Sequence, residues 1–194
     1  MMRRPTKLVS SPGVVAIGLC LALLGNANAK EIEGVRFADE IHAGPATLRL
    51  SDVGLMRYRY VIKAYVAALY LGESARPTDV LADAAKRLEI EYFYGIPAAG
   101  FVNATNEGIA ANVSPETLAR LRPRIDRLNL LYRDVKPGDR YALTYVPGVG
   151  TELALNGTTL GTIEGADFAA AVFAIWLGPK AIDESLKAQL LGRS

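Results

Sequence analysis

Residues 55–71 have the sequence LMRYRYVIKAYVAALYL, the longest strand-like stretch of the chain. Tyrosine and valine are abundant in it, and both residue types are typical of pleated, half-buried strands. Strands in globular proteins usually have about 3–10 residues. The stretch therefore predicts either one bent strand or two consecutive strands.

Shorter strands are predicted on both sides of this stretch from alternating apolar residues. They cover residues 35–41, 47–50, 87–94, 140–146, 151–155 and 158–163. The last two flank Asn156-Gly157, a pair that strongly favours a tight hairpin.

Helices are predicted mainly after the first group of strands. The first predicted helix begins at Thr78 and runs to about residue 85. The others cover residues 98–112, Pro115 towards Tyr132, 167–176 and 183–191. Pro123 should kink or divide the third of these helices. Strands come first, helices follow, a three-strand meander comes next and helices end the chain. This order predicts an α+β fold with a mainly antiparallel sheet.

The first 29 residues have the three parts of a cleavable signal peptide. Arg3, Arg4 and Lys7 form a basic start, residues 14–24 are apolar, and Ala27-Asn28-Ala29 resembles a cleavage site. The apolar run is shorter than the roughly 20 residues of a membrane span, although an uncleaved anchor is the alternative. We expect an exported domain at residues 30–194, with no integral membrane span once the signal is removed.

Removal of the signal changes the charge and the chemistry available to the domain. The chain has 22 basic and 20 acidic residues, and three of the basic ones lie in the signal. The remaining domain has 19 basic and 20 acidic residues, a net charge of −1. A near-neutral domain offers no electrostatic basis for nucleic-acid binding. Cys20 lies in the signal and His42 is the single histidine, which excludes disulfides, a thiol nucleophile and a multi-histidine metal site. We expect no metal and no cofactor, and we interpret His42 as an exposed turn residue.

An ordered set of motifs resembles the bacterial exported branch of the chalcone isomerase-like family. The motifs are DVGLMR at 52–57, IKAYVAALYL at 62–71, NEGIAAN at 106–112, DVKPGDR at 134–140, GTEL at 150–153, Asn156-Gly157 and FAIWLG at 173–178. The resemblance implies an open-faced β-sandwich, in which helices cover a large antiparallel sheet and a ligand lies between them. It also implies a periplasmic location.

The resemblance implies ligand-binding roles for Arg57, Tyr65 and Asn106. The family's plant enzymes close the ring of a chalcone and use an arginine to stabilise the anion. Its fatty-acid-binding branch grips a carboxylate with an arginine and a tyrosine. Arg57 stands where the family arginine lies, with Arg59 as the alternative, and its planar fork suits either anion. Tyr65 stands where the enzymes have threonine and the binding branch has tyrosine.

We therefore expect a non-catalytic protein that binds a fatty acid or a similar small amphipathic carboxylate, because the family's catalytic set is incomplete in this sequence. Phe101 is nearest to the enzymes' helix tyrosine and lacks its hydroxyl, and their C-terminal serine or threonine is not evident. The alternative is an isomerase, an intramolecular lyase that cyclises a chalcone-like enone. The sequence leaves open whether the chain is an enzyme.

A geometric condition applies to Arg57 and Tyr65. Eight residues of straight strand span roughly 27 Å, too far for one small ligand. The two side chains can converge only if the chain turns back around residues 60–62, which lack the usual glycine or asparagine. The resemblance implies such a bend.

Overall fold

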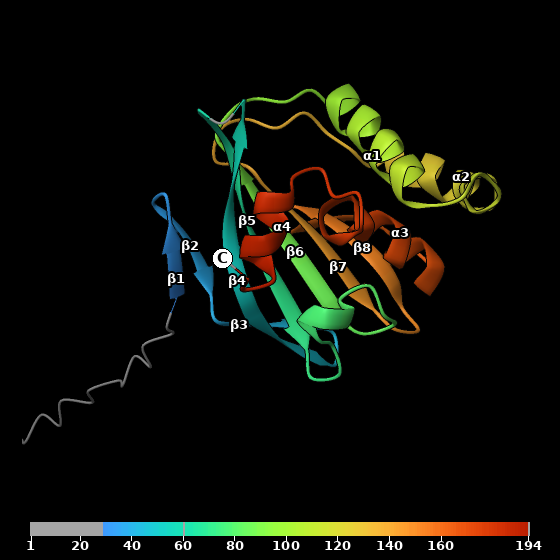
Figure 1. Cartoon of the computed structure of the whole chain (residues 1–194), viewed down its shortest axis with the longest axis horizontal. Coiled ribbons are helices and arrows are strands. Elements are labelled where there is room, and N and C mark those ends of the chain that lie inside the picture. Colours follow the sequence, from blue (N-terminus) through green and yellow to red (C-terminus); the bar gives the residue numbers. More distant parts are fainter. Residues whose placement is uncertain (1–28, 60, 194) are drawn as a thin grey trace, which may run out of the picture.

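The structure is a computed structural model that describes residues 29–59 and 61–193. The signal peptide predicted for residues 1–29 lies outside the described residues, apart from Ala29. A seven-stranded antiparallel sheet dominates the fold, and its strands lie side by side in chain order (Figure 1). They are β3 (Glu40–Ala43), β4 (Ala46–Tyr58), β5 (Ile62–Gly72), β6 (Lys86–Tyr92), β7 (Arg140–Val146), β8 (Gly150–Leu155) and β9 (Thr158–Ile163).

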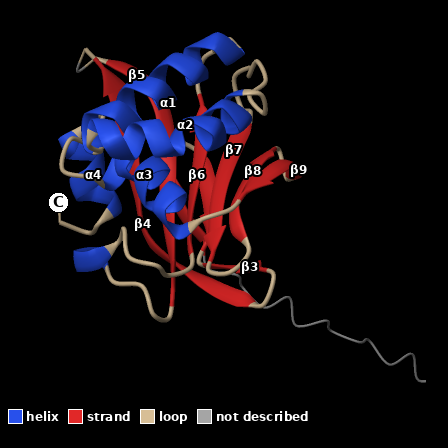
Figure 2. Ribbon diagram, turned by 90° about the vertical axis from the view of Figure 1, so that its right-hand side faces the viewer, coloured by secondary structure: helices blue, strands red, loops and turns tan. Residues whose placement is uncertain are grey.

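Four α-helices cover one face of this sheet (Figure 2). They are α1 (Ala98–Asn112), α2 (Pro115–Asn129), α3 (Ala166–Leu177) and α4 (Glu184–Leu190). A separate ribbon of β1 (Ala29–Ile32) and β2 (Val35–Ala38) packs on part of the opposite face. The predicted α+β class and its open-faced, antiparallel sheet are confirmed.

Each face of the sheet has its own apolar core, because successive strand residues point to opposite sides. On the helix face, Leu69 of β5 and Leu88 of β6 pack with Phe168 and Phe173 of α3. On the other face, Val66 and Tyr70 of β5 pack with Phe37 of β2. The alternating sequence of β5 therefore serves both cores.

The stretch at residues 55–71 forms two strands, as one of the two alternatives predicted. The chain reverses between β4 and β5, where the Val61 N–H donates to the Tyr58 carbonyl at 3.3 Å and Arg59 has a φ of 49°. Met56 lies opposite Tyr65, but the next β4 residue, Arg57, lies opposite Lys63. β5 therefore contains one extra residue, Ala64, at this point, which is a β-bulge.

The helix predicted from Thr78 is wrong, and Pro123 does not divide α2. Pro77–Asp79 form one turn of 3₁₀ helix (η1), followed by irregular turns up to β6. Val80, Ala84 and Ala85 are buried as their spacing suggested, but they reach the core from turns. A short isolated helix is costly to nucleate, and nothing else in this segment stabilises one. α2 continues through Pro123 to Asn129.

Gly150 allows the close approach of β8 to β9, so its replacement should destabilise the fold. Its φ is +125°, and a Cβ there would lie 2.7 Å from the carbonyl oxygen of Ile163. We expect Gly150→Ala to lower the free energy of unfolding by about 1–3 kcal/mol in chemical denaturation. Gly148 has a φ of +76° and open space around it, so Gly148→Ala should cost only about 1 kcal/mol. Equal losses in the two variants would contradict the role of the Ile163 carbonyl.

Candidate functional site

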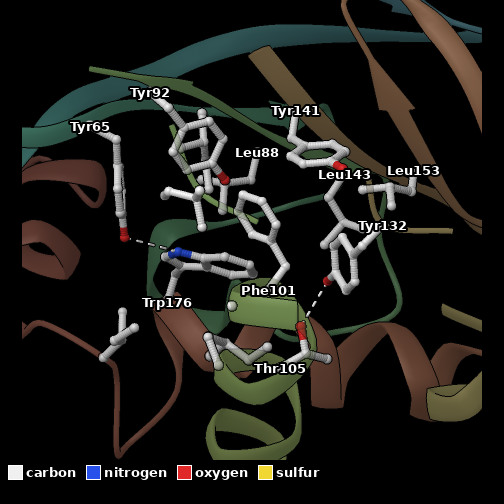
Figure 3. A pocket seen from close by; sticks show the side chains of 16 residues that line it. Tyr65, Leu88, Tyr92, Phe101, Thr105, Tyr132, Tyr141, Leu143, Leu153 and Trp176 are labelled. Carbon is white, nitrogen blue, oxygen red and sulfur yellow. Dashed lines mark hydrogen bonds between the residues drawn. The ribbon is translucent and has the colours of Figure 1, made fainter. Parts of the chain in front are cut away.

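A partly open cavity of about 180 Å³ lies between the helix face of the sheet and helices α1 and α3. Its sheet wall includes Tyr65, Leu88, Ile90, Tyr92, Tyr141, Leu143 and Leu153, and its helix wall includes Gly100, Phe101, Ala104, Thr105, Ile175 and Trp176 (Figure 3). Ile182, in the segment before α4, also lines it and is 48% exposed. Ala104 is also exposed, so the lining of the cavity includes residues at the surface on α1 and before α4.

The sheet wall follows from strand alternation and register. Leu88, Ile90 and Tyr92 are every second residue of β6, so they share the helix face. Tyr65 of β5 lies directly opposite Tyr92. Tyr141 of β7 lies opposite Ile90, on the other side of β6. Three neighbouring strands thus bring three tyrosines to one wall.

The aromatic rings of the cavity pack mainly edge to face. Tyr92 has its ring centroid 5.7 Å from that of Tyr65 and 5.3 Å from that of Phe101. Phe101 also contacts Tyr141, at 5.1 Å, and stacks on Tyr132, at 5.5 Å. Such contacts stabilise aromatic pairs beyond the burial of their surface, so the wall is well fixed.

The polar groups of the cavity are hydroxyls and one indole N–H. The Trp176 Nε1–H donates to the Tyr65 hydroxyl at 3.3 Å, which leaves the tyrosine's own hydrogen free to donate. Thr105 and Tyr132 share a hydrogen bond of 2.8 Å. Tyr141 is fully engaged with the Arg133 backbone, donating to its carbonyl and accepting from its N–H. The Tyr92 hydroxyl points into the cavity (Figure 3) and has no hydrogen-bond partner among the described residues.

Burial keeps these tyrosines protonated. Loss of solvation raises the pKa of Tyr65 far above its ordinary value, against a smaller lowering by the Trp176 hydrogen bond. The pKa of Tyr92 is raised well above 10 by burial and by the neighbouring tyrosines. Burial raises the pKa of Tyr132 to about 12. These hydroxyls can donate hydrogen bonds near neutral pH, but they cannot act as anionic bases.

Of the three residues predicted to bind a ligand, the structure places Tyr65 in the cavity and the other two outside its lining. Arg57 is exposed near the end of β4. It shares the sheet face of Leu55, which packs in the core away from the helices. Its partner across the ladder, Lys63, binds Glu33 in the turn between β1 and β2.

Asn106 lies on α1 and faces α2. Its Oδ1 accepts a hydrogen bond of 3.1 Å from the Asn129 side chain. It is half-buried and joins the two helices. The hairpin does bring the backbones of Arg57 and Tyr65 close, as the resemblance implied, but their side chains belong to opposite faces.

Several cavity residues were not predicted from the sequence as ligand-binding. They are Tyr92, Thr105, Tyr132, Tyr141 and Trp176. The period-two spacing of apolar residues in β6 and β7 would have placed Tyr92 and Tyr141 on the helix face. Trp176 belongs to an almost wholly apolar helix, as a core residue would, and it is half-buried in the cavity wall.

Charged groups are absent from the cavity lining within residues 29–59 and 61–193. A buried lysine, Lys86, lies on the helix side of β6 but at the strand's opposite end, where its ammonium donates to the Ala82 carbonyl. The described chain has no group of three or more histidine, cysteine, aspartate or glutamate side chains arranged to hold a metal ion. It also has no helix with both the length and the apolar character to cross a membrane.

Comparisons with known proteins agree with this architecture. A fatty-acid binding protein of Arabidopsis thaliana has a similar solved structure, with a TM-score of 0.64 and 15% sequence identity; the match covers 84% of this chain and 96% of that one. No curated protein matches the sequence. The family model described as chalcone isomerase-like matches residues 29–192, which is nearly the whole described chain. With this match, the chain belongs to the chalcone isomerase-like family.

Proposed function

We propose that this chain is an exported, non-catalytic binding protein that holds a fatty acid or a similar small amphipathic carboxylate in the cavity between sheet and helices. The observation that carries the proposal is an apolar cavity with two tyrosines on its sheet wall, Tyr65 and Tyr92, whose ring centroids lie 5.7 Å apart and whose hydroxyls can each still donate a hydrogen bond. The similar Arabidopsis structure is named as a fatty-acid binding protein, which supports the same ligand class. The signal-like residues 1–29 support export.

The size of the cavity favours a short acyl chain. About 180 Å³ is less than the roughly 300–1,000 Å³ of common small-molecule pockets. Leu143, Leu153 and Ile175 would surround the tail, and the partly open side near Ile182 would admit it. A longer chain would have to displace side chains or extend through the opening.

The head group would bind to neutral donors. Tyr92 can donate one hydrogen bond into the cavity, and Tyr65 can donate a second because its oxygen already accepts from Trp176. A buried carboxylate without a cation beside it is strongly disfavoured, and the usual response is a raised pKa. The acid would therefore be bound in its protonated form.

Cyclisation of a chalcone-like enone is less well supported. That reaction needs a group that stabilises a phenolate beside the substrate. Arg57, which the resemblance suggested for this task, is not part of the cavity lining. The buried tyrosines keep their protons and supply no base.

The head-group assignment predicts the behaviour of tyrosine variants. In calorimetric titration with octanoic acid, Tyr92→Phe and Tyr65→Phe should each weaken binding about five- to tenfold, the effect of one lost hydrogen bond. Tyr94 is exposed, so Tyr94→Phe is the matched control and should bind normally. Arg57→Gln should also bind normally. Loss of binding in Arg57→Gln, with normal binding in Tyr92→Phe, would refute this assignment.

The protonated head group predicts a pH-dependent affinity. Because the free acid has a pKa of about 4–5, like other carboxylic acids, octanoic acid should bind about tenfold more tightly for each unit that the pH falls between about 8 and 6. Octanol carries no titrating group, so its affinity should stay constant over this range. A constant affinity for octanoic acid would show that the carboxylate itself is bound.

The raised tyrosine pKa values predict a loss of stability in alkali. In the unfolded chain tyrosines lose their protons above about pH 10, whereas Tyr92 and Tyr132 keep theirs in the fold until a higher pH. Protonated tyrosine therefore stabilises the fold below about pH 10, and this stabilisation declines as the pH rises towards the folded pKa. Each such residue contributes about 1.4 kcal/mol per pH unit to the decline.

Denaturant titrations above about pH 10 should measure this slope. Tyr92→Phe should make the decline shallower, and Tyr94→Phe should leave it unchanged. Tyrosinate absorbance in the folded chain gives an independent check, because the buried hydroxyls should ionise only as the chain unfolds. Early ionisation of every tyrosine would contradict the buried environment.

A further inference from the structure

We propose that the end of the β4–β5 hairpin docks on the surface of an anionic membrane. We call this surface the hairpin tip and define it as Arg57, Tyr58, Arg59, Val61, Ile62 and Lys63. It is separate from the cavity, and its role goes beyond the function proposed above.

The hairpin tip projects from the body of the protein. β6 pairs with β5 only from Leu71 to Tyr65, so the pairs Arg57–Lys63 and Tyr58–Ile62 extend beyond the edge of β6. In Figure 2 the end of the hairpin lies at the margin of the fold, beside the β5 label. A two-stranded end of this kind can enter a lipid interface.

Large apolar side chains are concentrated and exposed at the tip. Val61 is 75% exposed, Tyr58 54% and Ile62 43%. These three are among seven exposed large hydrophobic residues in the described chain, and they fall within five positions of each other. Tyr94, also exposed, follows β6 at the same end of the sheet, where the Phe93 N–H donates to the Ala64 carbonyl. Clustered exposed apolar residues commonly mark an interaction surface.

The charge of the tip selects an anionic partner. Residues 55–71 contain Arg57, Arg59 and Lys63 and no acidic residue. Lys63 binds Glu33, whereas no salt bridge to Arg57 or Arg59 is present among the described residues. Basic side chains beside apolar and aromatic ones are the pattern that binds the interface of anionic lipids.

The two cross-strand pairs of the hairpin occupy different faces, and the Arg59 guanidinium lies 5.3 Å from the Tyr58 ring centroid. Tyr58 and Ile62 oppose each other, and by alternation Tyr58 shares the face of Met56, which packs in the helix-side core. Arg57 and Lys63 oppose each other on the reverse face. The tip is thus amphipathic, so its apolar face can enter the acyl region while the cations contact headgroup phosphates.

Vesicle flotation with residues 30–194 tests the proposal. The apolar residues 14–24 are left out because they would bind lipid by themselves; the described fold begins at Ala29. We expect binding to vesicles of phosphatidylcholine and phosphatidylglycerol in equal amounts, and little binding to phosphatidylcholine alone. High salt should weaken the binding, because it screens exposed charges.

Variants of the tip should separate its two contributions. The double variant Arg57→Gln, Arg59→Gln should bind anionic vesicles about 25-fold more weakly, about fivefold for each cation. The double variant Val61→Ser, Ile62→Ser should lose at least about tenfold. Arg49→Gln, on the same strand but ion-paired with Glu40, and Val149→Ser, in the turn between β7 and β8 at the other end of the sheet, are exposed controls and should bind normally.

Several results would overturn the proposal. They are equal binding to both kinds of vesicle, binding to neither, and no effect of the tip variants. Sedimentation showing a dimer that Val61→Ser, Ile62→Ser dissociates would assign the tip to self-association instead. Octanoic acid binding is measured separately, so failure of the membrane proposal is distinguishable from failure of the cavity proposal.

Discussion

The alternation of side chains along the β-strands, carried from strand to strand by the hydrogen-bonded register, determines which residues meet the helices. In β6, Leu88, Ile90 and Tyr92 face the helices, whereas Glu89 and Glu91 face the other side, where Arg140 binds both carboxylates. Register then places Tyr65 on one side of β6 and Tyr141 on the other. The helices cover this face, and the cavity lies between them and the sheet, lined by aromatic rings from both.

The same alternation separates polar chemistry into two environments. Ion pairs occupy the sheet face beneath the β1–β2 ribbon, where the Arg140 guanidinium also lies 4.6 Å from the Phe37 ring centroid. On the helix face, the cavity offers only neutral hydrogen-bond donors. A charged group on the cavity wall would lose its hydration, and without a counter-charge this loss would cost a large free energy of desolvation. A neutral wall avoids that cost, which favours the uncharged head group that we propose.

Sequence patterns were sufficient for elements with strong local signals. α1 has the predicted bounds 98–112, β7 has the bounds 140–146, and Asn156-Gly157 forms the expected hairpin. The helix predicted after Thr78 was wrong because the helical spacing of small apolar residues also suits a buried series of turns. Trp176 shows a different limit. A cavity wall and a packed core require the same residue types, so composition alone does not distinguish them.

Arg57 could not be placed from the sequence because its position depends on two local features without a residue signature. The chain reverses at Arg59 without glycine or asparagine at that turn, and Ala64 adds one residue to β5 just before Tyr65. Tyr65 therefore lies opposite Met56, and the neighbouring Arg57 points away from the cavity. As a consequence, the apolar and the basic cross-strand pairs of the hairpin lie on opposite faces. Tyr58 and Ile62 share the helix face with Met56 and Tyr65, whereas Arg57 and Lys63 lie on the face of the β1–β2 ribbon.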